Sequence, residues 1–450
     1  TNGDRVIDQK LSELTRCYSN VDLPVSVDST IDLSKSLEEL ILSFGVSARK
    51  AIHMPTVERF IAENMHRAAS DSISVPALTE LFWILFARKD WSRLTALAAT
   101  MRDRLPSLPL HVADLIFLAF YRGQRQRLVG GLDRDGILSG ADSTIAFLRK
   151  WWPEADSHTR VYDAMVSHIM GDVDCARQVF AASGDIELIE PFAGVSSVLL
   201  QSEYDEGTAN AASLEVATAS SEHAVLLSLD RGYFEKYAFF VAKRFAVTNP
   251  ENALHFHCVG FDPRPSIEEW QLPTNIGFTI DRSDLTRMDT RRRRGYFAAA
   301  RYLHLARYLD MYQSVFVADV DGHVTRNVRN IADEHSEDDV VLSTKVLESG
   351  RVVNRLPWES ITACAFMAFR TSGGRRFARL ISGYLQKILF NAEANGRPIW
   401  YADQTALFYS WRDSMADVRF STFKGNAFIQ RGSWQLFQGE KERLAFLAGA

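Results

Sequence analysis

The stretch SVFVADVDGHV, residues 314–324, ends a short, β-rich apolar run with two carboxylates. In an extended chain Asp319 and Asp321 project from the same side, about 6.5 to 7 Å apart. Two anions held this close repel each other. Mg²⁺ or Mn²⁺ removes that repulsion, because these ions prefer oxygen ligands and bind through one or two carboxylates plus substrate phosphates. The pair predicts a divalent-metal site, with an Asp-Gly turn at the strand end as the alternative.

The sequence around this stretch alternates between strand-like and helix-like patterns. Residues 231–248 and 296–311 have helical spacing, and short β-rich runs flank them: AVLLSL (224–229), LHFHCV (254–259), IGFTI (276–280) and SVFVA (314–318). Such alternation predicts a mostly parallel sheet with helices on its faces. Ligands bind beyond the carboxyl ends of the strands in sheets of this kind. Residues that follow strands are therefore the ones to examine.

The first half of the chain has a different pattern, helical from about residue 30 to 201. FARKDWSRL ends at Leu94 and FYRGQRQRL at Leu128, 34 residues later. A tetratricopeptide repeat has a period of about 34 residues. A third stretch, IMGDVDCARQVF, has the same pattern: an apolar helix, a break at Gly171-Asp172 and a second helix. These features predict a tetratricopeptide-like helical domain over residues 1–215, with an ordinary helical bundle as the alternative. A small, polar stretch at 210–222 predicts a linker before an α/β domain over residues 216–450.

Composition supports a globular protein of two domains. The chain has 450 residues, 46% of them hydrophobic and 24% charged, with a net charge of -5. Nothing in this balance indicates nucleic acid or an anionic membrane as a partner. Cys17, Cys175, Cys258 and Cys364 are too dispersed for a zinc knuckle or a disulfide framework, so buried thiols in a reducing compartment are expected. No signal peptide or membrane span is evident. We therefore expect a cytoplasmic protein.

The 32-residue stretch RRGYFAAARYLHLARYLDMYQSVFVADVDGHV, ending at Val324, resembles the core of the GT-A fold glycosyltransferases. It is most similar to the retaining group that includes glycogenin and the bacterial lipopolysaccharide galactosyltransferases. Four further stretches occur in the same order as in that family: LLSLDRGYFEKYA (226–238), VVLSTK (340–345), ITACAFMAFR (361–370) and YADQTALF (401–408). The resemblance covers residues 221–434. It implies an enzyme that moves a sugar from a nucleotide-sugar donor to a glycan or protein acceptor.

The resemblance also implies roles for particular residues. Asp319 and Asp321 would hold Mn²⁺ or Mg²⁺, and Asp319 would also touch the ribose of the donor. The metal bridges the donor diphosphate and stabilises it as leaving group. Arg301 would add positive charge near the phosphates. The remaining residues would contact donor or acceptor: Ser228, Asp230 and Tyr233 for base and ribose, Asp403 and Gln404 for the sugar, and Lys424 and Gly425 for the diphosphate. A UDP-sugar is the expected donor by analogy with the group.

The sequence departs from the family pattern at two places. Members of the group usually supply a third metal ligand from a C-terminal histidine, yet no histidine follows His335. Asn426 and His323 are the candidates that remain for this ligand. Where the family has a strand with Asn and Gly, this chain reads Thr362-Ala-Cys-Ala365, so no acceptor contact is assigned there.

Several residues have simpler interpretations that stay open. Arg301 is alternatively an exposed helix arginine, and Asp403 a helix N-cap before an apolar run. The basic run 291–294 is expected to be a solvated helix start, with docking of an acidic acceptor as the second reading. His255 and His257 are expected to be packed or solvent-facing rather than metal ligands. The helical domain would present a concave surface to an acceptor or partner, or would form a homo-oligomer.

Two other functions compete with glycosyl transfer. A strand ending in D-x-D-G also begins the haloacid-dehalogenase-type phosphohydrolases, which form an aspartyl phosphate. Against that function, His323 stands where that family has threonine, at least three strands precede the motif, and no later paired-aspartate element follows. The other alternative is a non-catalytic helical-repeat adaptor with an inactive transferase domain. The retained Asp319/Asp321 pair argues against it, because carboxylates that repel each other are not kept without a ligand.

Overall fold

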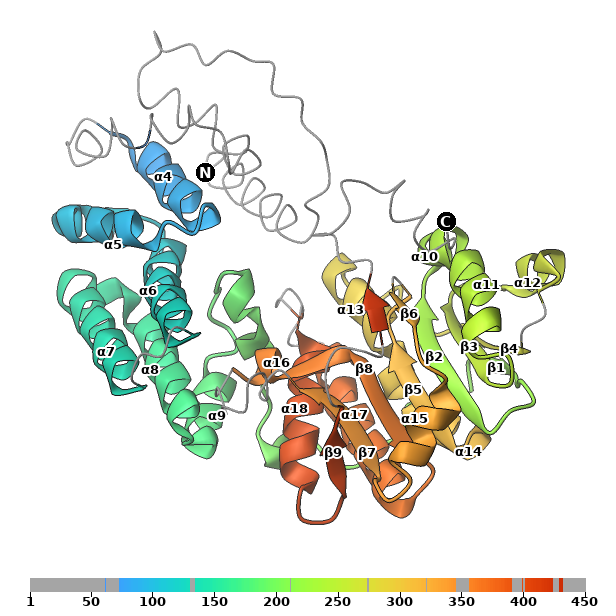
Figure 1. The fold of residues 1–450 in the computed structure, drawn as a ribbon. Helices are drawn as coiled ribbons and strands as arrows, with labels where there is room; N and C mark the ends of the chain where they lie inside the picture. Colours follow the sequence, from blue (N-terminus) through green and yellow to red (C-terminus); the bar gives the residue numbers. More distant parts are fainter. Residues whose placement is uncertain are drawn as a thin grey trace, which may run out of the picture. The chain divides into compact units, whose positions relative to one another are not determined.

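The computed structural model describes most of the chain beyond residue 72. The described residues are 61, 73–129, 134–210, 212–272, 275–320, 322–344, 356–390, 399, 401–423 and 429–431. They divide into two compact units. One holds the described residues up to Val179 together with Ile186–Phe192, and the other holds Phe180–Asp185 and the described residues from Ala193 onward. The predicted combination of a helical part and an α/β part is confirmed (Figure 1).

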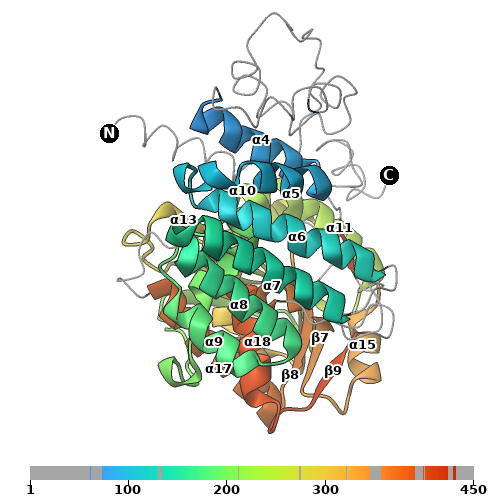
Figure 2. The same ribbon diagram turned by 90° about the vertical axis from the view of Figure 1, so that its left-hand side faces the viewer.

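The first unit is built from helices that lie in successive layers, which Figure 2 shows face on. Its α-helices are α4 (Val75–Ala87), α5 (Trp91–Thr100), α6 (His111–Val129), α7 (Arg134–Trp151), α8 (Asp156–Met170) and α9 (Val173–Ala182). Short 3₁₀ helices accompany them, η1 (Arg102–Ser107) and η2 (Pro153–Ala155). A further one, η3 (Glu190–Ser197), begins in this unit and ends in the second, which also holds η4 (Gln201–Glu203).

The stretches that look alike in sequence differ in structure. FARKDWSRL spans the turn between α4 and α5, where Asp90 caps α5, whereas FYRGQRQRL lies inside the continuous helix α6. The expected break at Gly171 is confirmed, because this residue ends α8 with a φ of 102° that suits glycine. The repeat of the first two stretches is therefore not a structural repeat.

A buried carboxylate joins the helices of the first unit. Asp114 of α6 is fully buried and accepts hydrogen bonds from the Tyr162 hydroxyl at 2.5 Å and the Ile189 backbone N–H at 3.0 Å. His158 Nδ1 lies 2.8 Å from the same carboxylate. The ring of Phe117 stacks on that of Tyr162 at 4.2 Å. These contacts satisfy a buried charge whose isolation would be costly, and they tie α6 to α8.

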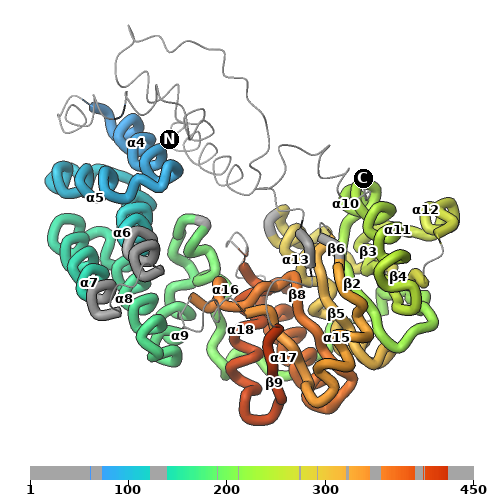
Figure 3. Tube along the Cα trace, in the orientation of Figure 1, coloured from blue at the N-terminus to red at the C-terminus, as the bar shows by residue number. Residues whose placement is uncertain are grey.

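The second unit is organised on an eight-stranded mixed sheet in the order β1-β4-β3-β2-β5-β8-β7-β9. The strands are β1 (Leu214–Ala217), β2 (His223–Leu229), β3 (Ala253–Val259), β4 (Asn275–Asp281), β5 (Ser314–Ala318), β7 (Val340–Thr344), β8 (Ile361–Phe369) and β9 (Phe420–Thr422). Strands β4, β3, β2 and β5 are parallel, as the sequence predicts. In the tube of Figure 3, β5 lies between β2 and β8. A separate two-stranded sheet pairs β6 (Gly322–Val324) with β10 (Ile429–Arg431).

Helices cover both faces of this sheet. They are α10 (Arg231–Tyr233), the π-helical turn η5 (Phe234–Ala238), α11 (Phe239–Thr248), α12 (Arg264–Trp270), α13 (Thr290–Leu303), α14 (Leu305–Met311), α15 (Val328–Glu334), α16 (Pro357–Ser360), α17 (Ser372–Phe390) and α18 (Ala402–Ser414). The expected helices at 231–248 and 296–311 are confirmed, the first as three consecutive segments and the second as α13 and α14.

The two faces of the sheet differ in chemistry. Val225, Leu227 and Phe256 point to one face and form an apolar core with η5, α11 and α15. The side chains at alternate positions point to the other face, toward α13 and α14, because side chains alternate along a strand. There His255 and His257 lie fully buried among hydrogen-bonding partners. Of the two expected environments, packed or solvent-facing, these histidines have the first.

Some expectations about local structure are wrong. The stretch 210–222 is not simply a linker, because β1 lies within it and pairs antiparallel with β4. The basic run 291–294 does begin α13, with Asp289 as N-cap, but Arg292 is buried instead of solvated. Cys258 and Cys364 are buried thiols as expected, whereas Cys175 is exposed and Cys17 lies outside the described residues. None of the described helices is long and apolar enough to cross a membrane.

Candidate functional site

The candidate site lies where β5 ends. The strand is buried throughout and stops at Ala318, so that Asp319 is the first residue beyond it. The Asp319 side chain is 41% exposed. Strand β5 therefore delivers a solvent-accessible carboxylate to the carboxyl edge of the parallel strands, where ligands bind in such sheets.

Arg301 reaches this carboxylate from α13. Its guanidinium Nη2 lies 2.5 Å from Asp319 Oδ1, and Nη1 donates to the backbone carbonyl of Ala318. Arg301 is only 3% exposed, so the alternative of an exposed helix arginine is wrong. A buried charge is tolerated only when it is paired and hydrogen-bonded, and the end of β5 supplies both.

The charge on Arg301 is held firmly. Burial alone would lower the pKa of the guanidinium, but Tyr302, Asp319 and Asp403 outweigh it and raise that pKa above the ordinary value. Arg301 therefore remains a cation at every pH at which the protein folds. It supplies a fixed positive charge beside a half-exposed carboxylate, a suitable environment for an anionic ligand.

Tyr302 completes the surroundings of Arg301 and was not identified from the sequence. Its buried hydroxyl accepts from Arg301 Nη2 at 3.1 Å and donates to the carbonyl of Ala363 in β8. Burial raises the pKa of this phenol well above its usual range. The tyrosine therefore links α13 to β8 and orients the guanidinium. Only its position next to Arg301 in the sequence hinted at this role.

Asp403 lies in the first turn of α18, whose N-cap is Tyr401. The N-cap interpretation of Asp403 is therefore wrong, although its carboxylate does accept from the Gln404 backbone N–H at 2.8 Å. Desolvation raises the pKa of Asp403, and the nearby charge of Arg301 opposes that shift. The structure thus brings Arg301, Asp319 and Asp403 into one electrostatic cluster, from three elements far apart in sequence.

Gln404 has a different environment from its neighbour. In the orientation that satisfies its side-chain amide, the amide donates to the carbonyl of Trp358 at 2.9 Å and that of Ile361 at 3.1 Å. These bonds fasten the start of α18 to α16 and β8. Gln404 therefore fixes the backbone next to Asp403 and so helps to hold Asp403 in place.

The expected base and ribose contacts lie at the end of the adjacent strand, β2. Leu226 is in register with Val317 of parallel β5, so the two strands end at the same edge. Asp230 follows β2 and accepts from the Tyr233 backbone N–H at 2.8 Å, and the Tyr233 side chain is 51% exposed. Ser228 is buried, and its hydroxyl donates to the carbonyl of Phe297 at 2.7 Å. The Tyr233 side chain is thus exposed at this edge, whereas the hydroxyl hydrogen of Ser228 is bonded to a carbonyl of α13.

Several predicted site residues cannot be placed. Asp321, Lys424, Gly425 and Asn426 lie outside the described residues, as does the side chain of His323. The predicted metal pair is therefore represented by Asp319 alone. Its half-exposed carboxylate at a strand end is an oxygen ligand of the kind that Mg²⁺ and Mn²⁺ prefer, so this residue fits the expected ion.

No protein-family model matches the chain, and no curated protein matches it. Similar solved structures are glycosyltransferases. Two are crystal structures of GlyE from Streptococcus pneumoniae: the apo form, with 14% identity and a TM-score of 0.30, and another with 13% and 0.32. Each match covers 46% of this chain and 46% of GlyE, less than half of either. The third is the apo structure of WbbM, a bifunctional glycosyltransferase, with 11% identity, a TM-score of 0.26, and 63% of this chain and 66% of that one covered. Values at this level do not establish a shared fold.

Proposed function

We propose that this protein is a metal-dependent glycosyltransferase that uses a nucleotide-sugar donor. The observation that carries the proposal is the cluster of Arg301, Asp319 and Asp403 at the carboxyl edge of the sheet. It combines a permanent cation, a half-exposed carboxylate and a desolvated carboxyl group. A nucleotide sugar presents matching groups: an anionic diphosphate, a metal ion bound to it, and a sugar that develops positive charge during transfer.

Each residue has a separate task in this proposal. Asp319, with Asp321, holds Mn²⁺ or Mg²⁺, which when bound stabilises the departing diphosphate. Arg301 fixes the Asp319 carboxylate in one orientation and adds positive potential where the diphosphate lies. Asp230 and Tyr233 receive the nucleoside at the end of β2, and a UDP donor is proposed by analogy with the resembled group. Lys424 and Gly425 would close over the diphosphate.

Asp403 is proposed to position the donor sugar and to steady the positive charge at its anomeric carbon. Gln404 holds Asp403 in place through the carbonyls of Trp358 and Ile361. We therefore propose retention of configuration at the anomeric carbon. An inverting enzyme needs a carboxylate base within about 2.6 to 3.2 Å of the acceptor hydroxyl, and that role would fall to Asp403. NMR of the new glycosidic bond separates the two, since a product with the anomeric configuration opposite to the donor's contradicts retention.

The helical unit is proposed to choose the acceptor, a glycan or protein, or to join two copies of the chain. Its helices lie in successive layers, and stacked helices present extended binding surfaces. This proposal is tested by replacing exposed residues of α5 and α8 and measuring the KM for acceptor. A rise in that KM with donor hydrolysis unchanged is the expected result, and unchanged acceptor kinetics in every such variant contradict it.

A phosphohydrolase of the haloacid-dehalogenase type is less well supported. In that class the D-x-D motif ends the first strand of the sheet, whereas here β2, β3 and β4 all precede β5 and are parallel to it. An inactive adaptor is also less well supported, because Arg301, Asp319 and Asp403 converge from three elements. Convergence of charged groups is costly and is typical of a functional site.

The direct test is release of free nucleotide from a panel of UDP-, GDP-, ADP-, CMP- and dTDP-sugars with Mn²⁺. We expect at least one donor to be hydrolysed slowly, with the activity lost in excess chelator and in Asp321→Asn. Asp310→Asn is the matched control, because the Asp310 side chain is 67% exposed and pairs with Arg375 away from the cluster. Release of phosphate from phosphomonoesters without release of nucleotide would favour the phosphohydrolase.

A further inference from the structure

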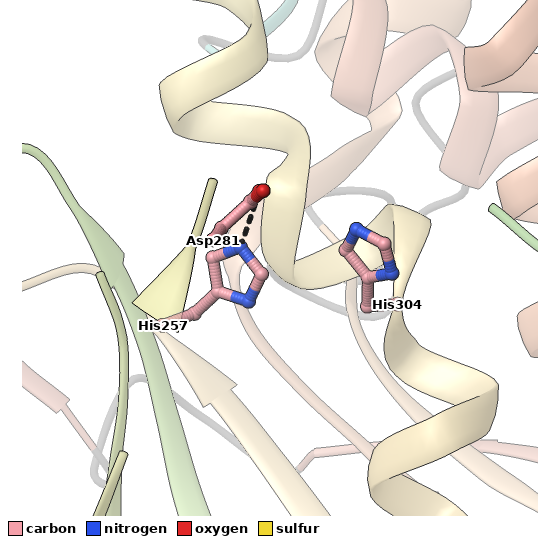
Figure 4. A group of neighbouring side chains, drawn as sticks. All are labelled: His257, Asp281 and His304. Atoms are coloured by element: carbon pink, nitrogen blue, oxygen red, sulfur yellow. Dashed lines mark hydrogen bonds and ion pairs between the residues drawn. The ribbon is translucent and has the colours of Figure 1, made fainter. Parts of the chain in front are cut away.

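A second cluster of polar side chains lies on the α13-facing side of the sheet and takes no part in the proposed reaction. It consists of His257 in β3, Asp281 at the end of β4, and His304, which follows α13. Figure 4 shows the three side chains as neighbours, with His257 bonded to Asp281 and His304 beside them. His257 and Asp281 are fully buried and His304 is 4% exposed. Burial of polar and ionisable side chains such as these is costly unless they are paired, hydrogen-bonded or bound to a metal.

The first two members are fully engaged. His257 Nε2 lies 3.1 Å from Asp281 Oδ2, and Nδ1 of the same ring lies 2.5 Å from the Tyr308 hydroxyl. The Asp281 carboxylate also accepts from the Tyr296 hydroxyl at 2.6 Å and from the Ser283 backbone N–H at 2.9 Å. Burial works to raise the pKa of Asp281, but the hydrogen bonds from His257, Ser283 and Tyr296 lower it. Asp281 is therefore an anion in the interior.

The third member, His304, differs from the other two in the hydrogen bonding of its Nε2 atom. His304 stacks on His257 with ring centroids 5.3 Å apart, and among the described residues none forms a hydrogen bond with its Nε2 atom. Burial and the neighbouring His257 lower the pKa of His304 to about 3, so its ring is neutral. An unpartnered buried polar atom costs about 1 to 3 kcal/mol. A ligand for a neutral imidazole nitrogen would remove this cost.

We propose that His257, Asp281 and His304 bind a first-row transition-metal ion of the zinc type. Two imidazoles and one carboxylate are ligands that suit Zn²⁺, and the fourth position is left for water. The three ligand atoms lie within 4.8 Å of one another. Ligands of a tetrahedral zinc ion are about 3.4 Å apart, at bonds of about 2.0 to 2.1 Å. The His257–Asp281 pair, at 3.1 Å, is close to this spacing, and rotation of the His304 ring out of its stack on His257 would complete the site.

The surroundings match those of known metal centres. A metal-bound histidine usually engages a polar group through its other ring nitrogen, and a metal-bound carboxylate is itself hydrogen-bonded. Tyr308 takes the first role for His257, and Tyr296 and Ser283 take the second for Asp281. Such outer partners orient the ligands before an ion arrives.

This metal would be buried and distinct from the ion expected at Asp319. It would fasten the residue that ends α13, three positions beyond Arg301, to β3 and β4. The two sites also differ in chemistry, because one offers nitrogen ligands and the other only oxygen. Zn²⁺ or Co²⁺ is expected at the histidine site and Mg²⁺ or Mn²⁺ at the other.

The test is titration of the chelator-stripped full chain with Co²⁺, a spectroscopic substitute for Zn²⁺. Asp319 and Asp321 are both changed to Asn beforehand, so that only the histidine site remains. We expect one equivalent of Co²⁺ to bind with visible absorption, and Zn²⁺ to displace it. In the same background His304→Gln should weaken binding by at least about 100-fold, since loss of even an outer partner costs 10- to 100-fold.

His255→Gln is the matched control, because His255 lies on the same face of β3 but has both ring nitrogens bonded, to Tyr312 and Thr279. Its Co²⁺ affinity should stay within a few-fold of the parent. Absence of Co²⁺ binding by the folded parent, or equal binding in His304→Gln, overturns the proposal. X-ray absorption of the Co²⁺-bound parent gives an answer even where His304→Gln does not fold. Two imidazole ligands support the site, and fewer than two overturn it.

Discussion

The guanidinium of Arg301 lies 2.5 Å from the carboxylate of Asp319, and the first side chain is buried while the second is 41% exposed. A charge on α13 thus fixes the first residue beyond β5. Lysine carries the same charge but lacks the fork that reaches Asp319, Ala318 and Tyr302 together. Arg301→Lys should therefore lower kcat/KM by roughly 30- to 150-fold, the equivalent of about 2 to 3 kcal/mol for hydrogen bonds to a charged group.

Arg294→Lys is the control for this variant, because Arg294 is an exposed arginine of the same helix. Steady-state kinetics with the donor identified in the nucleotide-release assay make the measurement. An Arg301→Lys enzyme as active as Arg294→Lys would show that the fork geometry is unimportant.

Asp403 should show opposite effects on stability and activity. Desolvation raises its folded-state pKa above the ordinary value, so the ionised form destabilises the fold. The penalty is absent below the unfolded-state pKa, about 3.8 to 3.9, and grows as the pH rises through the folded-state value. Asp403→Asn should therefore have a higher Tm than the wild type at pH 7.5 and no advantage near pH 4. Its kcat should fall strongly with little change in donor affinity.

Calorimetric scans at the two pH values and donor-saturation kinetics check both halves of this prediction. A variant that is destabilised at pH 7.5 would mean that the carboxylate stabilises the fold. A variant with full kcat would remove Asp403 from the reaction.

Tyr302→Phe should destabilise the protein and loosen Arg301. The substitution removes the hydroxyl that donates to Ala363 and accepts from Arg301, leaving buried groups without that partner. We expect a loss of about 1 to 3 kcal/mol in the free energy of unfolding. Urea titration gives the value, and a change under a few tenths of a kcal/mol would show that the phenol does not join α13 to β8.

His255 should make stability depend on pH. Burial and the nearby His257 lower the pKa of His255 to about 3, whereas the unfolded chain titrates near its ordinary value. The stability that the neutral ring contributes is complete above about pH 6.5 and is lost as the pH falls toward the folded-state value. Between pH 6.5 and 4.5 this amounts to about 2.7 kcal/mol, at about 1.36 kcal/mol per unit.

The check is the free energy of unfolding of wild type and His255→Gln, measured in urea between pH 7 and 4.5. The variant should be less stable at pH 7 and should lose less stability on acidification. If the free energy of unfolding of the two proteins changes with pH in parallel, the prediction that the His255 ring is buried in its neutral form is contradicted.

The sheet was predictable from sequence because its central strands are short apolar runs that helices separate, and all four were located to within a residue or two. Strand β1 was missed because LEVA reads as part of a polar stretch, and only its pairing with β4 makes it a strand. The identical spacing of two helical stretches predicted a repeat, yet one spans a turn and the other lies within α6. Local sequence did not distinguish these outcomes, because tertiary packing decides where a helix ends.

Within the candidate site, Asp319 was predictable as a charge next to a strand end, whereas Arg301 and Asp403 were predicted from the resemblance to a family. The structure brings all three together. Tyr302 was missed, because it acts through the backbone carbonyl of Ala363. Gln404 was named from the resemblance, but its bonds to the carbonyls of Trp358 and Ile361 depend on tertiary structure. The histidine cluster was also hidden, because His257, Asp281 and His304 come from separate elements with no metal-ligand spacing.

The central claim is that donor binding requires a metal held by Asp319 and Asp321, and thermal unfolding tests it most directly. With the preferred nucleotide sugar at 100 times its Kd and Mn²⁺ present, the wild type should gain about 2.7 kcal/mol of stability. The gain should vanish when chelator replaces Mn²⁺ and in the Asp319→Asn, Asp321→Asn double variant, while Asp310→Asn keeps it. The same stabilisation in excess chelator, or in the double variant, would contradict the claim.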